Sequence, residues 1–170
     1  QKEKYKAKFE SLFEEHRGKD FRGIGDFPHG DYDCLMCYSG GKDSTYTLYV
    51  LKTEYNARIL AVTVDNGFVS ERAVKNIRNV VESLGVDHYF IKPRFDILKR
   101  IFIACSSKNL YSRKTLERAS TICTSCMGLV KFITLRLAIE KGIPFITYGW
   151  SPGQSPIASS VFKTNPSMIR

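Results

Sequence analysis

The sequence has little that would place the chain in a membrane or outside the cell. No apolar run approaches the roughly 18 residues that a membrane span needs, and the first residues lack the pattern of a signal peptide. The five cysteines are an odd number without a secretory context, which favours a reducing compartment and cysteines kept for packing, metal binding or chemistry. We therefore expect a cytoplasmic protein with no membrane partner.

Acidic residues are too few to balance the basic ones. The chain has 17 Asp plus Glu against 26 Lys plus Arg, which gives a net charge of +9. Such an excess favours an anionic partner, for example a nucleotide, RNA or an acidic metabolite. It is equally compatible with a solvated surface, because the sequence has no dense Lys/Arg tract. Both interpretations stay open at this point.

With 170 residues, 43% of them hydrophobic, the chain is long enough for one domain with a sizeable core. Short apolar runs predict strands at residues 34–38, 59–64, 87–91 and 144–149. Helical periodicity predicts helices at residues 4–16, 44–55, 71–84, 95–105 and 126–141. Strands that are apolar throughout and alternate with helices indicate a parallel sheet covered on both faces. We predict a doubly wound α/β domain of the Rossmann type.

The pattern divides the chain into three parts. Residues 1–32 form an N-terminal helix and a glycine-rich connection, 33–150 the α/β domain, and 151–170 a loop-rich C-terminal segment. The chain starts at Gln1 rather than Met and stops at "KTNPSMIR", which does not look like a finished terminus. We expect it to be a piece of a longer protein.

Two familiar glycine patterns are missing where the first predicted strand ends. Neither G-x-x-x-x-G-K-[ST] nor G-x-G-x-x-G occurs; the chain reads "SGGKDS" there, from Ser39 to Ser44. A turn of this kind exposes backbone N–H groups beside a helix N-terminus, which together bind anions such as phosphate. Lys42 adds a positive charge, and Asp43 is a ligand for Mg²⁺ or a helix cap. The alternative is an ordinary turn with Asp43 or Ser44 as the helix N-cap.

The hexapeptide resembles the PP-motif of the PP-loop ATP pyrophosphatases, also called adenine nucleotide alpha hydrolases. The following "ILAVTVDNGF" resembles the second strand of that family, and the resemblance runs from Asp33 to Trp150. It implies that ATP is cleaved to AMP and pyrophosphate to adenylate an acceptor carbonyl, with Mg²⁺ as cofactor. The residues that it implies for pyrophosphate and metal, including a catalytic role for Lys42 and Asp43, are Ser39, Gly40, Gly41, Lys42, Asp43 and Ser44. Those that it implies for the nucleotide side are Asp65, Asn66 and Gly149.

A C-x-x-C pair is the second chemical feature. Cys123 and Cys126 lie just before or in the first turn of a predicted helix, among polar neighbours. Such a pair is a sulfur carrier, a redox pair or half of a metal site, and we favour these roles over packing. Cys34, Cys37 and Cys105 fall in apolar patterns, so we predict that they are buried.

Other candidate residues carry weaker signals. His16, His29 and His88 have no metal-ligand spacing, so we interpret them as structural. Trp150 and Gln154 follow the fourth predicted strand at its ligand-binding edge, where they are either a substrate wall or part of a packed loop. Lys163 is a further candidate for a phosphate contact in the same segment.

Two branches of the family compete for the acceptor. The stretches "FESLFEEHRG", "YDCLMCYSGGKDSTYTLYVLK" and "LAVTVDNGF" resemble the N-acetyl sugar amidotransferase branch, which implies a nucleotide-linked sugar, ammonia from a glutaminase subunit, and surface polysaccharide synthesis. The pair Cys123/Cys126 is similar to that of thiolating members, which implies tRNA or a small molecule as acceptor and zinc or an iron-sulfur cluster at the cysteines.

The loop after Gly149 helps to choose between these branches. It reads "GWSPGQSP" and lacks the His and acidic pair of several tRNA-modifying members. We therefore predict amide transfer, with thiolation as the first alternative and a non-catalytic ATP- or AMP-binding module as the second. A homo-oligomer is compatible with each of these functions.

Overall fold

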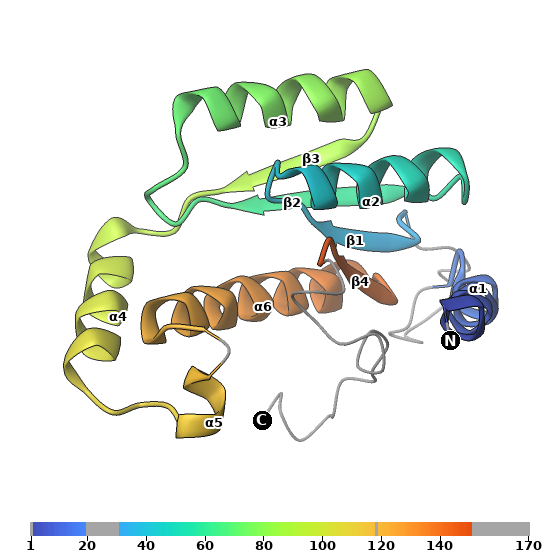
Figure 1. The fold of residues 1–170 in the computed structure, drawn as a ribbon. Coiled ribbons are helices and arrows are strands. Elements are labelled where there is room, and N and C mark those ends of the chain that lie inside the picture. The colour runs from blue at the N-terminus through green and yellow to red at the C-terminus, as the bar shows by residue number, and fades with distance from the viewer. Residues whose placement is uncertain (1, 20–30, 118, 151–170) are drawn as a thin grey trace.

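The computed structural model describes residues 2–19, 31–117 and 119–150 (Figure 1). Its strands are β1 (Cys34–Cys37), β2 (Ile59–Val64), β3 (Asp87–Ile91) and β4 (Phe145–Tyr148). Its helices are α1 (Lys2–His16), α2 (Lys42–Thr53), α3 (Glu71–Leu84), α4 (Phe95–Ser107), α5 (Arg113–Leu116) and α6 (Thr121–Lys141). The predicted elements are confirmed, while the short helix α5 was not predicted.

The four strands form one parallel sheet in the order β3-β2-β1-β4. Cys34 pairs with Ile59 on one side and with Phe145 on the other. Helices α2 and α3 cover one face of the sheet, and α6 lies on the opposite face (Figure 1). The chain therefore winds in both directions from β1, which confirms the doubly wound α/β prediction. In such folds ligands bind outside the carboxyl ends of the strands where the winding reverses, here β1 and β4.

A hydrophobic core lies on each face of the sheet, because alternate side chains of a strand point to opposite faces. The larger core lies under α2 and α3, and its largest fully buried members include Phe13, Met36, Leu48 and Ile77. The smaller core lies under α6 and contains Leu35, Leu60, Val62, Ala138 and Ile143. Residues of the central strands β1 and β2 thus alternate between two apolar layers, which explains their continuous apolar sequence.

Strand β3 departs from the predicted pattern. We expected strands that are apolar and covered on both faces, yet Tyr89 and Phe90 of β3 are exposed. The reason is position, because β3 is an edge strand of the sheet among the described residues. Its sequence "DHYFI" is apolar enough to predict a strand, but it does not show that the strand lies at an edge.

Helix α1 packs against the sheet through aromatic side chains. Phe13 is buried, with its ring centroid 6.0 Å from that of Phe145 on β4, and Phe9 and Tyr55 complete the contact. His16 of the same helix packs edge-on against Phe145 and bonds to a carbonyl in its own helix, consistent with a structural role.

A buried carboxylate ties the turn after α1 to the start of the sheet. Asp33 is 1% exposed, accepts hydrogen bonds from the guanidinium and the backbone N–H of Arg58, and accepts a third bond from the N–H of Gly18. Burial alone would raise the pKa of Asp33, but these bonds outweigh it and lower the pKa. The stabilisation is complete above the ordinary pKa of an aspartate and is lost as the pH falls through the lowered value.

Helix α6 begins earlier than predicted and is unusually apolar. It starts at Thr121 rather than Cys126, because the hydroxyl of Ser120 caps it by accepting from the N–H of Cys123. By length and composition alone this helix could cross a membrane, which corrects the expectation that no apolar run is long enough. In this structure it contacts β1, β4 and α4, as expected for a helix that covers a sheet.

Candidate functional site

The turn from Ser39 to Ser44 joins β1 to α2 at the carboxyl edge of the sheet. Gly40 has φ +75°, a backbone conformation that favours glycine. A Cβ atom added at Gly40 would lie 2.5 Å from Cγ1 of Ile77, a buried residue of α3. The turn therefore lies directly on the core, and only glycine fits at this position.

The first turn of α2 has no side-chain cap, and Gly41 is its N-cap. This contradicts the alternative in which Asp43 or Ser44 is the cap. The hydroxyl of Ser44 donates to the carbonyl of Gly41 at 3.0 Å and lies 3.1 Å from the hydroxyl of Ser39. Uncapped N–H groups at a helix N-terminus bind phosphate well, because the helix dipole adds to their attraction.

Two charged side chains flank this first turn. The side chain of Lys42 is 91% exposed, and its ammonium lies 3.2 Å from a carboxylate oxygen of Asp43. An exposed pair of this kind contributes little to stability, so both groups are free to exchange partners when a ligand arrives. Lys42 can then neutralise phosphate charge, and Asp43 can supply an oxygen ligand to Mg²⁺.

Gly149 brings the end of β4 against the same helix. A Cβ atom added at Gly149 would lie 2.3 Å from Cα and 2.7 Å from the backbone nitrogen of Ser44. These are backbone atoms, which a side-chain rotation cannot move out of the way. The loop after β4 therefore meets the turn from Ser39 to Ser44, the proposed phosphate turn, at the point where the winding of the sheet reverses.

Asp65 and Asn66 follow β2 along the same edge. The carboxylate of Asp65 is nearly buried, accepts from the N–H of Gly67 at 2.8 Å, and lies 3.8 Å from the ammonium of Lys92. The side-chain carbonyl of Asn66 accepts from the N–H of Phe68, while its amide donates to the sulfur of Cys126 at 3.6 Å. The structure thus brings together two candidates from different motifs, Asn66 and Cys126.

A polar network beneath the turn was missed by sequence reasoning. The hydroxyl of Thr63 donates to the backbone carbonyl of Tyr38 at 2.7 Å and lies 2.8 Å from Nε2 of His88. Since the Thr63 proton goes to the carbonyl, Nε2 of His88 is the donor in the second bond. Burial, with a smaller contribution from the charge of Arg78, lowers the pKa of His88. The only signal in the sequence was a threonine inside an apolar strand.

The cysteines divide largely as predicted. Cys34 and Cys105 are buried, Cys123 is exposed and Cys126 is half-buried. Cys37 is a partial correction, because it is half-buried at the end of β1 rather than fully enclosed. Burial nevertheless raises the pKa of Cys37 to about 11, against smaller lowering effects of hydrogen bonds to Thr134 and Tyr148.

A metal at the C-x-x-C pair needs more ligands than the described residues supply. Within residues 2–19, 31–117 and 119–150, no group of three His, Cys, Asp or Glu side chains could hold a metal ion. Cys123 and Cys126 by themselves supply two thiols, whereas structural zinc sites and iron-sulfur clusters usually take four protein ligands. The described residues therefore do not form a metal site at this pair.

The end of β4 carries an aromatic stack. The rings of Tyr148 and Trp150 are stacked with centroids 4.8 Å apart, and the ammonium of Lys131 on α6 lies 5.2 Å from the centroid of the Trp150 ring. Trp150 is 39% exposed, so one part of it is packed and another faces outward. The candidates Gln154, Lys163 and His29 lie outside the described residues.

Thiol labelling of the native protein should separate the cysteines. We expect Cys123 to react fastest and Cys126 next, because reactivity follows exposure and thiolate fraction. Cys34 and Cys37 should react slowly, since burial raises their pKa to about 12 and about 11. Mass spectrometry after brief alkylation at pH 7.5, with urea-unfolded protein as the control, measures the order. Equal protection of all five cysteines would contradict it.

Comparison with known proteins agrees with this geometry. Residues 33–114 match the family model described as queuosine biosynthesis protein QueC. The chain is 29% identical over 120 residues to an uncharacterized protein of Methanocaldococcus jannaschii, covering 71% of this chain and 39% of that protein. It is 25% identical over 123 residues to argininosuccinate synthase of Symbiobacterium thermophilum, covering 68% of this chain and 28% of the synthase. The chain thus spans well under half the length of these relatives.

Two solved structures share the fold. An NH3-dependent NAD synthetase from Campylobacter jejuni superimposes with a TM-score of 0.56 at 10% identity, covering 89% of this chain and 58% of the synthetase chain. The U34-tRNA thiolase NcsA from Methanococcus maripaludis, solved with its [4Fe-4S] cluster, superimposes with a TM-score of 0.54 at 21% identity. The match covers 85% of this chain and 48% of the thiolase chain.

The fold and the phosphate turn define an α/β domain of the adenine nucleotide alpha hydrolase type. The motif, its place after β1 and the relatives agree with this class. Together the family-model match, the relatives and the shared fold support the PP-loop ATP pyrophosphatase superfamily for this chain.

Proposed function

We propose that this protein cleaves ATP to AMP and pyrophosphate in order to adenylate the carbonyl of an acceptor. One observation carries the proposal: Gly149 lies against the backbone of the uncapped first turn of α2. This contact lies at the edge of the sheet where ligands bind in such folds. The remaining site residues, from Ser39 to Ser44 with Asp65 and Asn66, line the same edge.

The chemistry assigns a role to each part of the turn. The backbone N–H groups at the start of α2 bind the β- and γ-phosphates, Lys42 neutralises their charge, and Asp43 would hold Mg²⁺. The acceptor oxygen attacks the α-phosphorus, the bond to the β-phosphate oxygen breaks, and pyrophosphate leaves. A nucleophile then adds to the adenylated carbon and displaces AMP. The protein contributes positioning and charge stabilisation.

For the second step we propose nitrogen transfer to a small molecule, as in N-acetyl sugar amidotransferases of surface polysaccharide synthesis. The support is the sequence resemblance that runs from residue 9 through β2. In this reading a glutaminase subunit supplies ammonia, the acceptor is a nucleotide-linked sugar, and the reaction is cytoplasmic. The missing His-acidic loop after Gly149 argues against tRNA.

Sulfur transfer is a second candidate because of one contact. The amide of Asn66 lies 3.6 Å from the sulfur of Cys126, which places a thiol at the edge where the nucleotide would bind. A thiolase that resembles this chain in fold was solved with a [4Fe-4S] cluster. Thiolation would use Cys126, and a cluster there would need ligands beyond the described residues.

Product analysis tests the proposal directly. We expect the full-length protein, given ATP, Mg²⁺, ammonia and a UDP-linked N-acetyl sugar, to form AMP and pyrophosphate but no ADP. Parallel reactions replace ammonia by a sulfide donor and the sugar by purified tRNA. Thiolated nucleosides in the tRNA reaction would transfer the assignment to thiolation. ADP as the product, or ATP binding with no turnover under any condition, would contradict pyrophosphatase chemistry; the second outcome would favour a regulatory binding module.

A further inference from the structure

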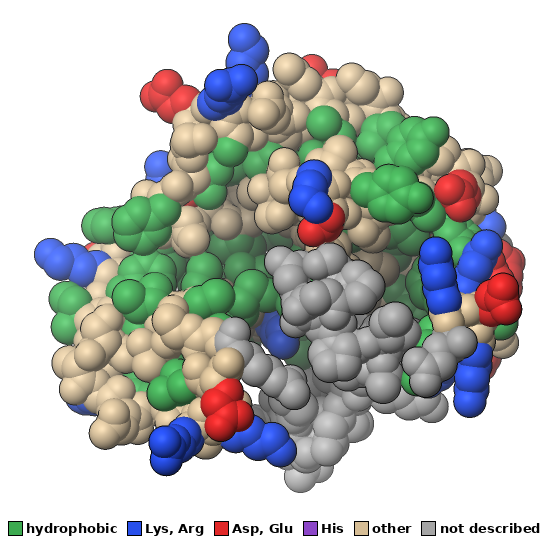
Figure 2. Space-filling model, viewed as in Figure 1, with side chains coloured by type: hydrophobic (Ala, Val, Ile, Leu, Met, Phe, Trp, Pro, Cys, Tyr) green, Lys and Arg blue, Asp and Glu red, His purple; other side chains and the backbone are tan. Residues whose placement is uncertain are grey.

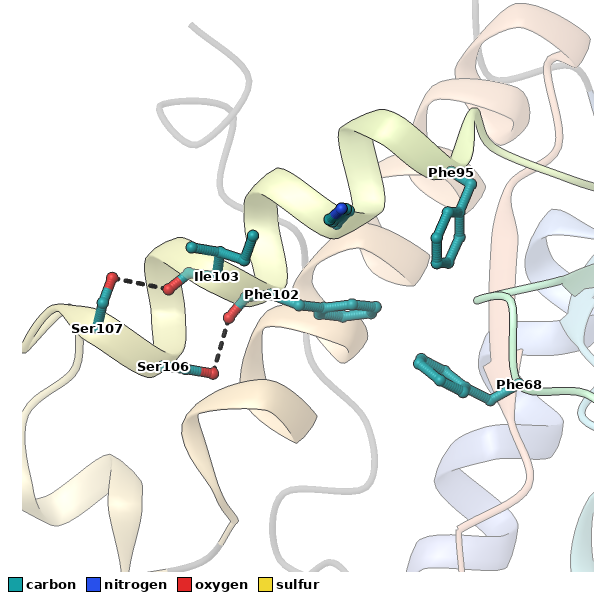
Figure 3. Close-up of a pocket in the computed structure, with 7 residues that line it drawn as sticks. Phe68, Phe95, Phe102, Ile103, Ser106 and Ser107 are labelled. Carbon is teal, nitrogen blue, oxygen red and sulfur yellow. Dashed lines mark hydrogen bonds between the residues drawn. The ribbon is translucent and has the colours of Figure 1, made fainter.

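An open groove of about 520 Å³ lies beside α4 and contains three phenylalanine rings. Phe95 and Phe102 project from α4, and Phe68 projects from the loop after β2 toward them (Figure 3). Lys99, Ile103, Ser106 and Ser107 complete the lining. Figure 2 shows hydrophobic side chains gathered on this side of the molecule, around a hollow.

These rings remain accessible instead of packing into the core. Phe68 is 72% exposed and Phe95 is 56% exposed, although each belongs to a residue type that is usually buried. The rings of Phe68 and Phe102 are 6.0 Å apart and tilted by 41°. The exposed rings of Phe68 and Phe95 can stack with a further planar group.

Local backbone geometry holds the groove in this shape. Gly67 has φ +88°, and a Cβ atom there would lie 3.0 Å from the Phe95 ring. The carboxylate of Asp65 fixes the same turn by accepting from the N–H of Gly67. A glycine is therefore needed at this position if the loop is to bring Phe68 close to α4.

The groove adjoins the proposed reaction edge, because Phe68 in its lining donates its backbone N–H to the side-chain carbonyl of Asn66 at 3.1 Å. Asn66, two residues before Phe68, donates to Cys126 of α6, and α4 packs against α6. The phosphate turn follows β1 in the middle of the sheet, whereas α4 follows β3 at its edge. A ligand in the groove therefore approaches the nucleotide site from the β3 side.

The side chains of the lining favour a ligand that has both a planar ring and a negatively charged group. Aromatic side chains stack on nucleobases of any sequence. Lys99 is exposed at the groove and supplies a cation, while Ser106 and Ser107 donate to carbonyls of their own helix at 2.8 and 2.7 Å. A volume of about 520 Å³ also lies within the range of small-molecule sites.

We propose that this groove binds the nucleoside diphosphate part of a nucleotide-linked acceptor, with the base on the phenylalanine rings and the diphosphate at Lys99. The proposal rests on the proposed function and names the acceptor class for that same site. A single lysine in the lining suits a diphosphate better than the polyanionic backbone of RNA.

Binding without turnover tests this assignment. The full chain is saturated with α,β-methylene-ATP, which occupies the ATP site and resists cleavage, and is then titrated with UDP and with GDP by calorimetry. We expect binding of at least one of these probes. Phe68→Ala and Phe102→Ala should each raise its Kd about tenfold, because stacking on an aromatic ring contributes substantially per base. Lys99→Ala should raise it several-fold.

Phe132→Ala is the matched control. Phe132 is 63% exposed on α6 and does not line the groove, so its removal should leave the Kd unchanged. Melting temperatures of all variants should stay near that of the parent, since the truncated rings are not core residues.

Four outcomes would overturn the proposal. They are no binding of UDP or GDP, an unchanged Kd in the groove variants, competition of the probes with α,β-methylene-ATP, and weaker α,β-methylene-ATP binding in those variants. Preferential binding of a single-stranded RNA through the same three residues would also overturn it in favour of RNA. This experiment measures binding and not turnover. Its result can therefore be interpreted even if the protein forms no AMP.

Discussion

Gly149→Ala is expected to abolish AMP formation or reduce it by about 100-fold or more. The new methyl group would lie 2.3 Å from Cα of Ser44, so either the loop after β4 or the first turn of α2 has to move. A displacement near 1 Å is enough to cost about two orders of magnitude in rate when it disturbs positioning. The measurements are the rate of pyrophosphate release and the Kd of ATP.

Gly128→Ala supplies the control for this prediction. Gly128 lies within α6, and a Cβ atom there meets nothing within 4 Å. The variant should keep normal activity and melt at an equal or slightly higher temperature, because alanine is the better helix former. Normal ATP binding and turnover in Gly149→Ala would show that the close approach to Ser44 has no part in catalysis.

Lys42→Ala and Asp43→Ala are each expected to lower the rate of AMP formation by about 10²-fold or more while leaving the fold intact. In the proposed reaction Lys42 would neutralise charge that develops on the departing pyrophosphate and Asp43 would supply a metal ligand, so both would act where charge stabilisation is strongest. Stability should hardly change, since the two side chains form an exposed ion pair on the first turn of α2.

Circular dichroism and a pyrophosphate assay at saturating ATP measure the two effects separately. Lys75→Ala, which removes an exposed lysine from α3, is the matched control and should behave like the parent. If Lys42→Ala retained most of its activity, the turn would bind ATP through backbone groups alone and the assigned role of the lysine would be wrong.

Much of the fold was accessible from the sequence because local signals agreed. The apolar runs at β1, β2 and β4 and the periodic pattern of α3 predicted elements whose bounds match the structure closely. The turn between β1 and α2 was also predictable, since its paired glycines follow an apolar run and precede a helical pattern, while its binding of phosphate stays a prediction. Its neighbour Gly149 came only from the family resemblance.

The rest could not be predicted, because it depends on contacts between distant segments. The bond between Asn66 and Cys126 joins residues separated by 60 positions. The groove at Phe68 needs α4 to lie beside the loop after β2, and periodicity specifies neither that arrangement nor its exposed rings. The start of α6 was missed because its first turn is rich in threonine and serine, which favour caps and turns over helix interiors.

The contact between Gly40 and Ile77 has a consequence for genetics. Ile77 is fully buried in α3, so a survey of tolerated substitutions would class it with ordinary core positions. Yet its side chain lies directly under the turn for which we propose phosphate binding, close enough to exclude any Cβ at Gly40. Alleles that change the shape of residue 77 should therefore resemble active-site alleles in their phenotype, although this residue lies beneath the turn rather than among the groups that face the nucleotide.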